Sequence, residues 1–339
     1  MTDYAKKMQR YVYIDIMKGI AIVLVVLGHI LGAFYTNRNL VLPLDYRLIY
    51  ITIYSFHMPV FFFIGGLFAD RWAERSFKTA MADKIRRLAV PYFFFGFLLA
   101  LVKEYDGGRY ANTAGGLKVF MSSLFTPFNL FWFIYILFFF FLFYYLIVHS
   151  RILHNPKLCV WVLSLILFFA HPFLPNIWIL RTFSRFLVFF SSGTYMLQFF
   201  DSYKGVFDKK GIVIIFAFAT ALIGYDYFYI LKKYQYMNYL FGVTGFLGFF
   251  CIYIVSQAIE KRTDRYSSLI LWGKQSMQIY CLHPFIIAAL RFLFSKYMKV
   301  GYLYPISFVL AFLTIIICHL LIKKMNTENK FYKIVFGLR

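Results

Sequence analysis

Most of this chain consists of apolar runs that are about as long as a lipid bilayer is thick. Of its 339 residues, 62% are hydrophobic and 23% aromatic, and the mean hydropathy is +0.69. A soluble core does not need so much apolar surface, whereas a transmembrane helix needs about 20 such residues in succession. We therefore predict an all-α, polytopic membrane helical bundle of about ten transmembrane helices. The predicted spans are residues 12–34, 47–69, 87–103, 128–148, 157–175, 177–199, 211–231, 239–259, 268–290 and 302–322.

Basic residues in the connecting segments indicate how these spans are oriented. One span is short and two nearly abut, so a count of nine or eleven stays open. Lys and Arg outnumber Asp and Glu by 36 to 14 and fall mainly between the apolar runs. With the N-terminus inside, the inner segments carry about twice as many of them as the outer ones, which is typical of a positive-inside topology. We therefore predict two cytoplasmic termini in the inner (cytoplasmic) membrane, contact with membrane lipid, and no nucleic-acid partner.

The connections between the runs leave no room for a second domain. Every loop is too short to fold alone, so we predict that residues 1–339 form one transmembrane domain with no appended soluble domain. The pattern Gly242-x-x-Gly245-x-x-Gly248 is typical of close helix packing. The cysteines have no paired spacing, which indicates apolar packing and not disulfides or a metal site. They all lie inside apolar runs: Cys159, Cys251, Cys281 and Cys318.

The first apolar run carries three ionisable residues, Asp15, Lys18 and His29. Such residues are rare in bilayer-spanning helices, because each costs at least about 2.5 kcal/mol at mid-membrane unless it is partnered or hydrated. Asp15 and Lys18 are three residues apart, so they share a helix face and can neutralise each other. Lys18 and His29 are 11 residues apart, which is three turns at about 3.6 residues per turn. One face of the first helix therefore presents a cation near its inner end and an imidazole near its outer end.

Four more ionisable residues are predicted at the same depth as His29. His57, Arg181, Arg185 and His283 fall in the middle-to-outer part of their spans, so four helices contribute to this level. Each histidine alone is explained by a hydrogen bond to a neighbouring carbonyl. Their joint occurrence favours a hydrated cavity, in which a neutral imidazole is suited to general-base catalysis. Neither an HExxH motif nor a Cys/His cluster supports a metal site.

A basic cluster lies at the cytoplasmic start of the third span. Lys84, Arg86 and Arg87 come just before Pro91, and Lys84 and Arg87 are one helical turn apart. Basic side chains at the positive end of a helix suit a phosphate-bearing ligand. The alternative interpretation is an ordinary positive-inside flank of a membrane helix. Neither a P-loop nor a GxGxxG motif is present in the sequence.

Several of these residues belong to motifs that follow one another along nearly the whole chain. The motifs are Asp15-x-x-Lys18-Gly19, Val26-Leu27-Gly28-His29, Ser55-Phe56-His57-Met58-Pro59-Val60-Phe61-Phe62, Lys84-x-x-Arg87, Phe131-Trp132-Phe133, Arg185 with Gly193, and Ser276 to His283-Pro284. In kind and order they resemble those of the integral-membrane acyltransferase family 3. The forms with KG and SFHMPxFF are most similar to the fucose 4-O-acetylase-like sugar acetyltransferases.

The resemblance implies a membrane O-acyltransferase. Such an enzyme moves an acetyl or other short acyl group from cytoplasmic acyl-CoA to a hydroxyl of an extracytoplasmic glycan or lipid-linked sugar. Acetyl-CoA is then a co-substrate, and no tightly bound cofactor is implied. The family's Arg-x10-His motif falls on Lys18 and His29, and its Arg-x-x-Arg motif falls on Lys84 and Arg87. Each first Arg is thus replaced by Lys, which keeps the charge but loses the bidentate fork.

The same resemblance suggests a role for each candidate residue. His29 would be the general base, while Lys18 would steer the donor arm or balance charge with Asp15. The donor's phosphates would bind the basic cluster of Lys84, Arg86 and Arg87. Stabilisation of the oxyanion or contact with the acceptor would fall to His57, Arg185, His283 and Trp132, and the first three could instead orient His29.

Two other functions fit the same residues. A transporter or flippase of a glycan precursor would line its pathway with buried charges, although the chain shows no two halves with matching interrupted spans. A structural subunit of an envelope-glycan assembly would leave the buried His and Arg residues unexplained. The sequence does not specify the acceptor sugar, the acyl group, or whether the protein is a homo-oligomer.

Overall fold

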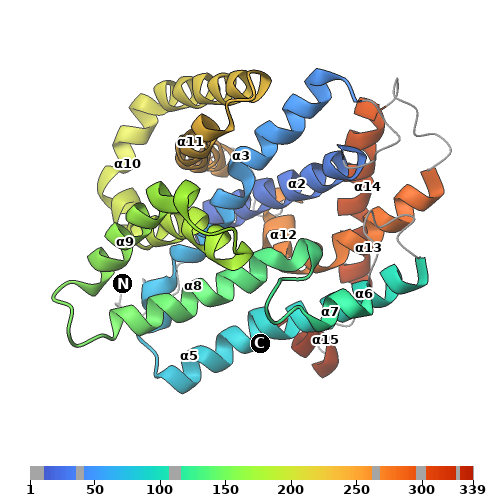
Figure 1. Ribbon diagram of the computed structural model, residues 1–339, viewed down its shortest axis with the longest axis horizontal. Helices are drawn as coiled ribbons and strands as arrows, with labels where there is room; N and C mark the ends of the chain where they lie inside the picture. The colour runs from blue at the N-terminus through green and yellow to red at the C-terminus, as the bar shows by residue number, and fades with distance from the viewer. Residues whose placement is uncertain are drawn as a thin grey trace.

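The computed structural model describes residues 11–35, 42–106, 116–261, 268–294, 303–325 and 329–338, which form helices joined by short connections (Figure 1). This part of the chain contains no β-strand, and the predicted all-α, polytopic bundle is confirmed. Residues 1–10 lie outside the described residues. The side of the membrane on which the termini lie stays a prediction.

Eight helices among the described residues are long and apolar enough to cross a membrane, and they correspond to eight of the ten predicted spans. The predicted span 128–148 is α8 (Trp132–Val148), whose 17 residues are few for a full crossing. The predicted span 177–199 is not a separate helix, because it continues into 211–231 as the single helix α10 (Trp178–Ile230). The eight are Val12–Tyr35, Leu44–Gly66, Phe77–Tyr105, Pro156–Phe173, Lys210–Ile230, Tyr236–Glu260, Ser276–Leu293 and Pro305–Lys324.

Helix α2 (Val12–Tyr35) lies at the centre of the bundle. It packs against α3 (Leu44–Gly66), α11 (Tyr234–Glu260) and α14 (Leu303–Lys324), and Figure 1 shows it enclosed between α3 and α14. Most of its side chains are buried, including that of Asp15 in its first turn. Asp15 therefore faces protein and not lipid.

The predicted span 268–290 is broken at Gln275 into α12 (Ser268–Lys274) and α13 (Ser276–Phe294). Helix α12 lies against α2 with almost no space between the two backbones. A Cβ atom added to Gly273 would lie 1.7 Å from the carbonyl oxygen of Asp15. Only glycine permits this approach, which places the start of α13 beside the first turns of α2.

The glycine pattern in α11 serves helix packing, as predicted. A Cβ atom on Gly245 would lie 2.6 Å from the ring of Phe189 in α10, and one on Gly248 would lie 2.8 Å from the side chain of Phe56 in α3. Helix α11 therefore packs closely on both α10 and α3.

Helix α5 (Phe77–Lys84) leads into α6 (Val90–Asp106) through a π-helical turn, η1 (Ile85–Ala89). Pro91 follows this turn and has no backbone N–H, so the carbonyl of Arg87 loses its α-helical partner and the turn widens. Such turns are frequent at functional sites. The other described helices are α4 (Ala69–Ala73), α7 (Leu117–Met121), η2 (Asn129–Phe131), α9 (Pro156–Ala170), η3 (His171–Phe173) and α15 (Lys330–Val335).

Candidate functional site

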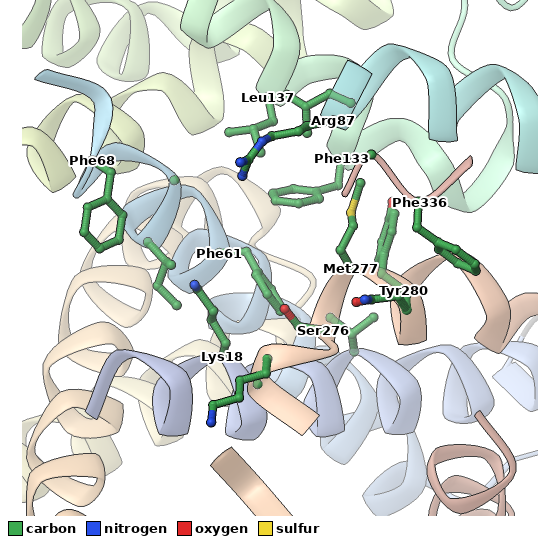
Figure 2. A pocket seen from close by; sticks show the side chains of 18 of the residues that line it. Lys18, Phe61, Phe68, Arg87, Phe133, Leu137, Ser276, Met277, Tyr280 and Phe336 are labelled. Atoms are coloured by element: carbon green, nitrogen blue, oxygen red, sulfur yellow. The ribbon is translucent and has the colours of Figure 1, made fainter. Parts of the chain in front are cut away.

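A cavity of about 500 Å³ lies between α2, α3, η1, α8 and the start of α13 (Figure 2). Its volume is in the range of small-molecule binding sites. Aromatic and aliphatic side chains form most of its lining, and basic side chains enter it from separate parts of the chain. This combination suits a ligand with an anionic part and an uncharged part.

The cavity joins the two groups of ionisable residues that the sequence singles out. Asp15 and Lys18 border it from α2, and Lys84 and Arg87 border it from the end of α5 and from η1. Figure 2 shows Lys18 and Arg87 on opposite sides of the space. With Lys274 at the end of α12, the lining has four basic residues and one acidic residue. The balance of charge favours an anionic ligand.

The three residues of the predicted phosphate-binding cluster are placed differently. The Nζ atom of Lys84 lies 3.2 Å from the centroid of the Phe141 ring, in a cation–π contact. The Nε atom of Arg87 donates to Oδ1 of Asp83 at 3.1 Å. Arg86 does not line the cavity. The structure therefore brings Lys84 and Arg87 to the site and leaves Arg86 beside it.

An apolar path leads from these basic residues toward His29. Val25 of α2 lines the cavity, and His29 lies one turn further along the same helix face. Phe61 and Phe133 also line the cavity (Figure 2). From Lys18 to His29 the helix rises about 17 Å, at about 1.5 Å per residue. A ligand that is anchored at the basic end and reaches the imidazole must therefore be long and extended.

His29, His57 and His283 come together around Tyr54. The rings of His29 and His283 stack with centroids 5.1 Å apart, and the ring of Tyr54 lies edge-on to His57 at 4.8 Å. The Tyr54 hydroxyl is 3.2 Å from Nδ1 of His29. His29 keeps part of its surface accessible, whereas His57 and His283 are 1% and 0% exposed. Of the three rings, His29 is therefore the one that a substrate can reach.

Backbone hydrogen bonds determine the tautomers of the two buried histidines. Nδ1 of His57 lies 2.7 Å from the carbonyl oxygen of Ile53, and Nδ1 of His283 lies 3.2 Å from that of Ile279. A carbonyl oxygen only accepts hydrogen bonds, so each Nδ1 carries a proton and the neutral ring has its lone pair on Nε2. Within the described ranges, both Nε2 atoms are buried without a hydrogen-bond partner. Each neutral ring therefore presents an acceptor to its surroundings, not a donor.

Arg185 and Trp132, which the sequence groups with these histidines, have other surroundings. The guanidinium of Arg185 lies 3.9 Å from the centroid of the Phe241 ring. The indole of Trp132 packs against Phe186 with ring centroids 5.3 Å apart. Arg181 donates to a backbone carbonyl in the connection before α10. The contacts recorded for the described residues join none of the three to the histidines, so the histidines alone of this predicted set converge.

Three parts of the site were not predicted from the sequence: Tyr54, Lys274 at the end of α12, and residues 336–338. Tyr54 precedes His57 by three residues and shares its helix face, so its spacing was a usable signal. Phe336, Gly337 and Leu338 also line the cavity, from a part of the chain far from every other lining residue. Nothing in their sequence indicates that position.

Comparison with known proteins identifies the family. Residues 11–323 match the acyltransferase domain of acyltransferase family 3, and because this match covers most of the chain, the protein belongs to that family. Its apolar helices make it a multi-pass membrane protein. A similar protein is the Nodulation protein NolL of Sinorhizobium fredii (strain NBRC 101917 / NGR234), which is 33% identical over 125 residues. The alignment covers 36% of this chain and 33% of that protein. No solved structure matches the chain.

Proposed function

We propose that this protein is a membrane O-acyltransferase that transfers an acetyl group from cytoplasmic acetyl-CoA to a hydroxyl of an extracytoplasmic glycan or lipid-linked sugar. The observation that carries the proposal is the single cavity that joins Lys84 and Arg87 to the face of α2 leading to His29. Membership of the acyltransferase family supports acyl transfer. The motif resemblance to sugar acetyltransferases supports an acetyl group and a sugar acceptor.

The donor matches the cavity in charge and in shape. Acyl-CoA has phosphate groups at its nucleotide end and a long uncharged pantetheine arm that ends in the thioester. Lys84 and Arg87 would hold the phosphates through charge-assisted hydrogen bonds, while the arm follows the apolar path past Phe61 and Val25. Lys18, near Asp15, would steer the arm where it enters. Because acetyl-CoA is cytoplasmic, the basic end would face the cytoplasm and the protein would lie in the inner membrane.

His29 would act as the general base. When Nδ1 of His29 donates to the Tyr54 oxygen, Nε2 carries the lone pair that takes the proton of the acceptor hydroxyl. The hydroxyl oxygen then attacks the thioester carbonyl, and the carbon–sulfur bond breaks as the tetrahedral intermediate collapses. The thiolate leaves and takes the proton from the imidazolium. The products are an O-acetyl sugar and the free thiol of CoA.

His57 and His283 would position the reacting groups. A neutral ring whose lone pair is on Nε2 cannot donate a hydrogen bond from that atom to the oxyanion of the intermediate. Their rings would instead hold the imidazole of His29 in place, because His283 stacks on His29 and His57 packs against Tyr54. Arg185 and Trp132 receive no role in this mechanism, because their recorded contacts are with other aromatic side chains.

The test is mass spectrometry of surface glycans from cells that lack the protein and are complemented with wild type, His29→Ala or His154→Ala. Removal of the protein should eliminate a defined acetyl mass from a glycan. Wild type should restore it, and His29→Ala should not, at equal protein level. His154→Ala is the matched control, because this histidine is exposed in the connection before α9.

Two outcomes would contradict the proposal. Intact acetylation with His29→Ala would exclude the imidazole as the base. Unchanged acetylation in cells without the protein, together with less glycan at the surface, would indicate a glycan transporter in which His29 lines the pathway.

A further inference from the structure

The basic residues that line the cavity differ in their surroundings. Arg87 pairs with Asp83, and the ammonium group of Lys84 lies over the ring of Phe141. Lys274, the last residue of α12, lines the cavity as well. It is exposed, and within the described ranges no hydrogen bond or ion pair is recorded for it. The positive charge of Lys274 is therefore available to an anionic ligand.

Two close backbone contacts fix the position of Lys274. A Cβ atom on Gly273 would lie 1.7 Å from the carbonyl oxygen of Asp15, and one on Gly19 would lie 2.2 Å from that of Leu269. The two contacts are one helical turn apart on each helix, so α12 runs antiparallel to α2 and touches it along its length. The end of α12, with Lys274, is thus held beside the first turn of α2.

The chain that follows α12 stays at the cavity. The side chain of Gln275 accepts a hydrogen bond from Nδ1 of His319 in α14, at 2.8 Å, so α14 supports the connection between α12 and α13. Ser276 then lines the cavity, and Figure 2 shows it with Lys18 on the side of the space opposite Arg87. The cavity therefore has two basic walls, one formed by the end of α5 with η1 and the other by α2 with α12.

Two basic walls suit a ligand with two separate anionic groups. The proposed donor has such groups: a diphosphate joined directly to the pantetheine arm, and a monophosphate on the 3′-hydroxyl of the ribose. The diphosphate must lie where the arm begins, and Lys84 meets this need because its ammonium group lies over an aromatic ring of the apolar lining.

The 3′-phosphate lies at the other end of the nucleotide, separated from the arm by the ribose. As a phosphate monoester it carries about −1.5 to −2 charges at pH 7. An exposed ammonium group suits it, because a lysine is a compact point charge with three donors and the phosphate can keep part of its hydration. Lys274 has these properties and belongs to the wall opposite Arg87.

We propose that Lys274 binds the 3′-phosphate of the acyl-CoA donor, so that the enzyme distinguishes coenzyme A from dephospho-coenzyme A, which lacks this group. The inference rests on the proposed function and refines it, because it leaves the diphosphate to Lys84 and Arg87. The close contact between α12 and α2 then holds the lysine in a fixed place relative to the helix that carries His29.

The experiment is isothermal titration of the detergent-purified full-length protein with CoA and with dephospho-CoA. Wild type should bind CoA about tenfold more tightly, the effect of one charge-assisted contact at an exposed site. Lys274→Ala should bind CoA about tenfold more weakly than wild type does, and dephospho-CoA equally well. Lys274→Arg keeps the charge and should keep the preference. Lys324→Ala is the matched control, because Lys324 is also exposed and also ends its helix but does not line the cavity.

Two further measurements separate Lys274 from the other wall. Arg87→Ala should weaken the binding of both ligands by the same factor and leave the preference for CoA intact, because both ligands contain the diphosphate. Added salt screens contacts between exposed charges. It should therefore reduce the preference of wild type, whereas Lys274→Ala has no preference to lose.

The outcomes distinguish this inference from the proposed function. If wild-type protein neither binds CoA nor uses acetyl-CoA, the proposed function fails. If wild type uses acetyl-CoA, three results overturn the inference alone. They are equal affinity of wild type for the two ligands, a preference for CoA that survives in Lys274→Ala, and a preference that is lost in Arg87→Ala.

Discussion

The basic cavity and the histidine cluster share helix α2 but differ in exposure and in charge. At the cavity, the side chain of Arg87 is 44% exposed. At the cluster, His57 and His283 are 1% and 0% exposed and bond to carbonyls of their own helices. A charged group beside Arg87 would lose little solvation, whereas burying the same charge at the cluster would be costly.

This difference separates binding from chemistry. In the proposed function, residues of the cavity would contact a part of the donor that does not react, so they should affect its affinity in the ground state and the transition state alike. Residues of the cluster would act on the reacting groups only, so they should affect turnover. Each of the predictions below changes one region and measures whether the other responds.

The largest effect is expected from His29→Ala. Loss of the general base should lower kcat by about 10²–10⁴-fold, while the affinity for CoA stays that of wild type, because His29 does not line the cavity. Single-turnover kinetics with the purified protein and isothermal titration with CoA measure the two quantities. A parallel loss of CoA binding would show that the two regions do not act separately.

The reverse pattern is expected from Arg87→Ala. Charge-assisted hydrogen bonds contribute about 1.5–3 kcal/mol, so the KM for acetyl-CoA should rise by roughly 10–100-fold, with kcat unchanged. Arg87→Lys keeps the charge and should show a smaller rise, since only the planar fork is lost. Steady-state kinetics of both variants measure the KM for acetyl-CoA and kcat. A fall in kcat with unchanged KM would mean that Arg87 acts in the chemical step.

Gly273→Ala tests the contact that joins α12 to α2. Its Cβ atom would be placed 1.7 Å from the Asp15 carbonyl oxygen, so the helices must separate, at an expected cost of about 1–3 kcal/mol. A lower thermal unfolding temperature in detergent should accompany weaker CoA binding, because Gly273 and Asp15 both line the cavity. Gly224→Ala, which has room for a methyl group, should unfold as wild type does. Equal unfolding temperatures for the two variants would contradict the close approach.

The sequence predicts those features of the fold that depend on local pattern. Apolar runs of span length identify eight helices, because hydropathy alone determines whether a segment enters lipid. Two predicted features of the fold are wrong, one because of a tertiary contact and one because a helix continues through polar residues. The helix breaks at Gln275, next to the backbone contact between Gly273 and α2. Local hydropathy does not predict such a contact between distant segments. The predicted spans 177–199 and 211–231 are one helix, because the polar residues between them do not interrupt helical geometry.

In the candidate site, too, the sequence predicts local features but not contacts between distant segments. Helical spacing places Lys18 and His29 on one face of α2, and Lys84 and Arg87 one turn apart, which a sequence can show. The two pairs meet at one cavity that leads toward His29 because distant helices pack together. Residue spacing along the sequence does not predict this packing. Residues 336–338 illustrate the limit, because their position follows from a turn at Gly337 against a π-helical turn some 250 residues earlier.

The smallest effect is expected from Tyr54→Phe, at the point where the cluster holds His29. The substitution removes the hydroxyl that lies 3.2 Å from Nδ1 of His29 but keeps the ring that packs on His57. A hydrogen bond of this kind contributes about 0.5–1.5 kcal/mol, so kcat should fall by roughly 2–10-fold. The affinity for CoA should stay unchanged. Tyr35→Phe is the matched control, because its hydroxyl bonds to that of Tyr229 and not to a histidine.

Comparing Tyr54→Phe with Tyr35→Phe tests whether the basic cavity and the histidine cluster act separately. If the Tyr54 hydroxyl holds the tautomer of His29 that takes the acceptor proton, its loss slows turnover without weakening the donor complex, and Tyr35→Phe has no such effect. If Tyr54→Phe instead weakens CoA binding at constant kcat, the donor reaches past Val25 to the tyrosine. The cavity and the cluster would then form one continuous site, and the division of binding from chemistry along α2 would have to be abandoned.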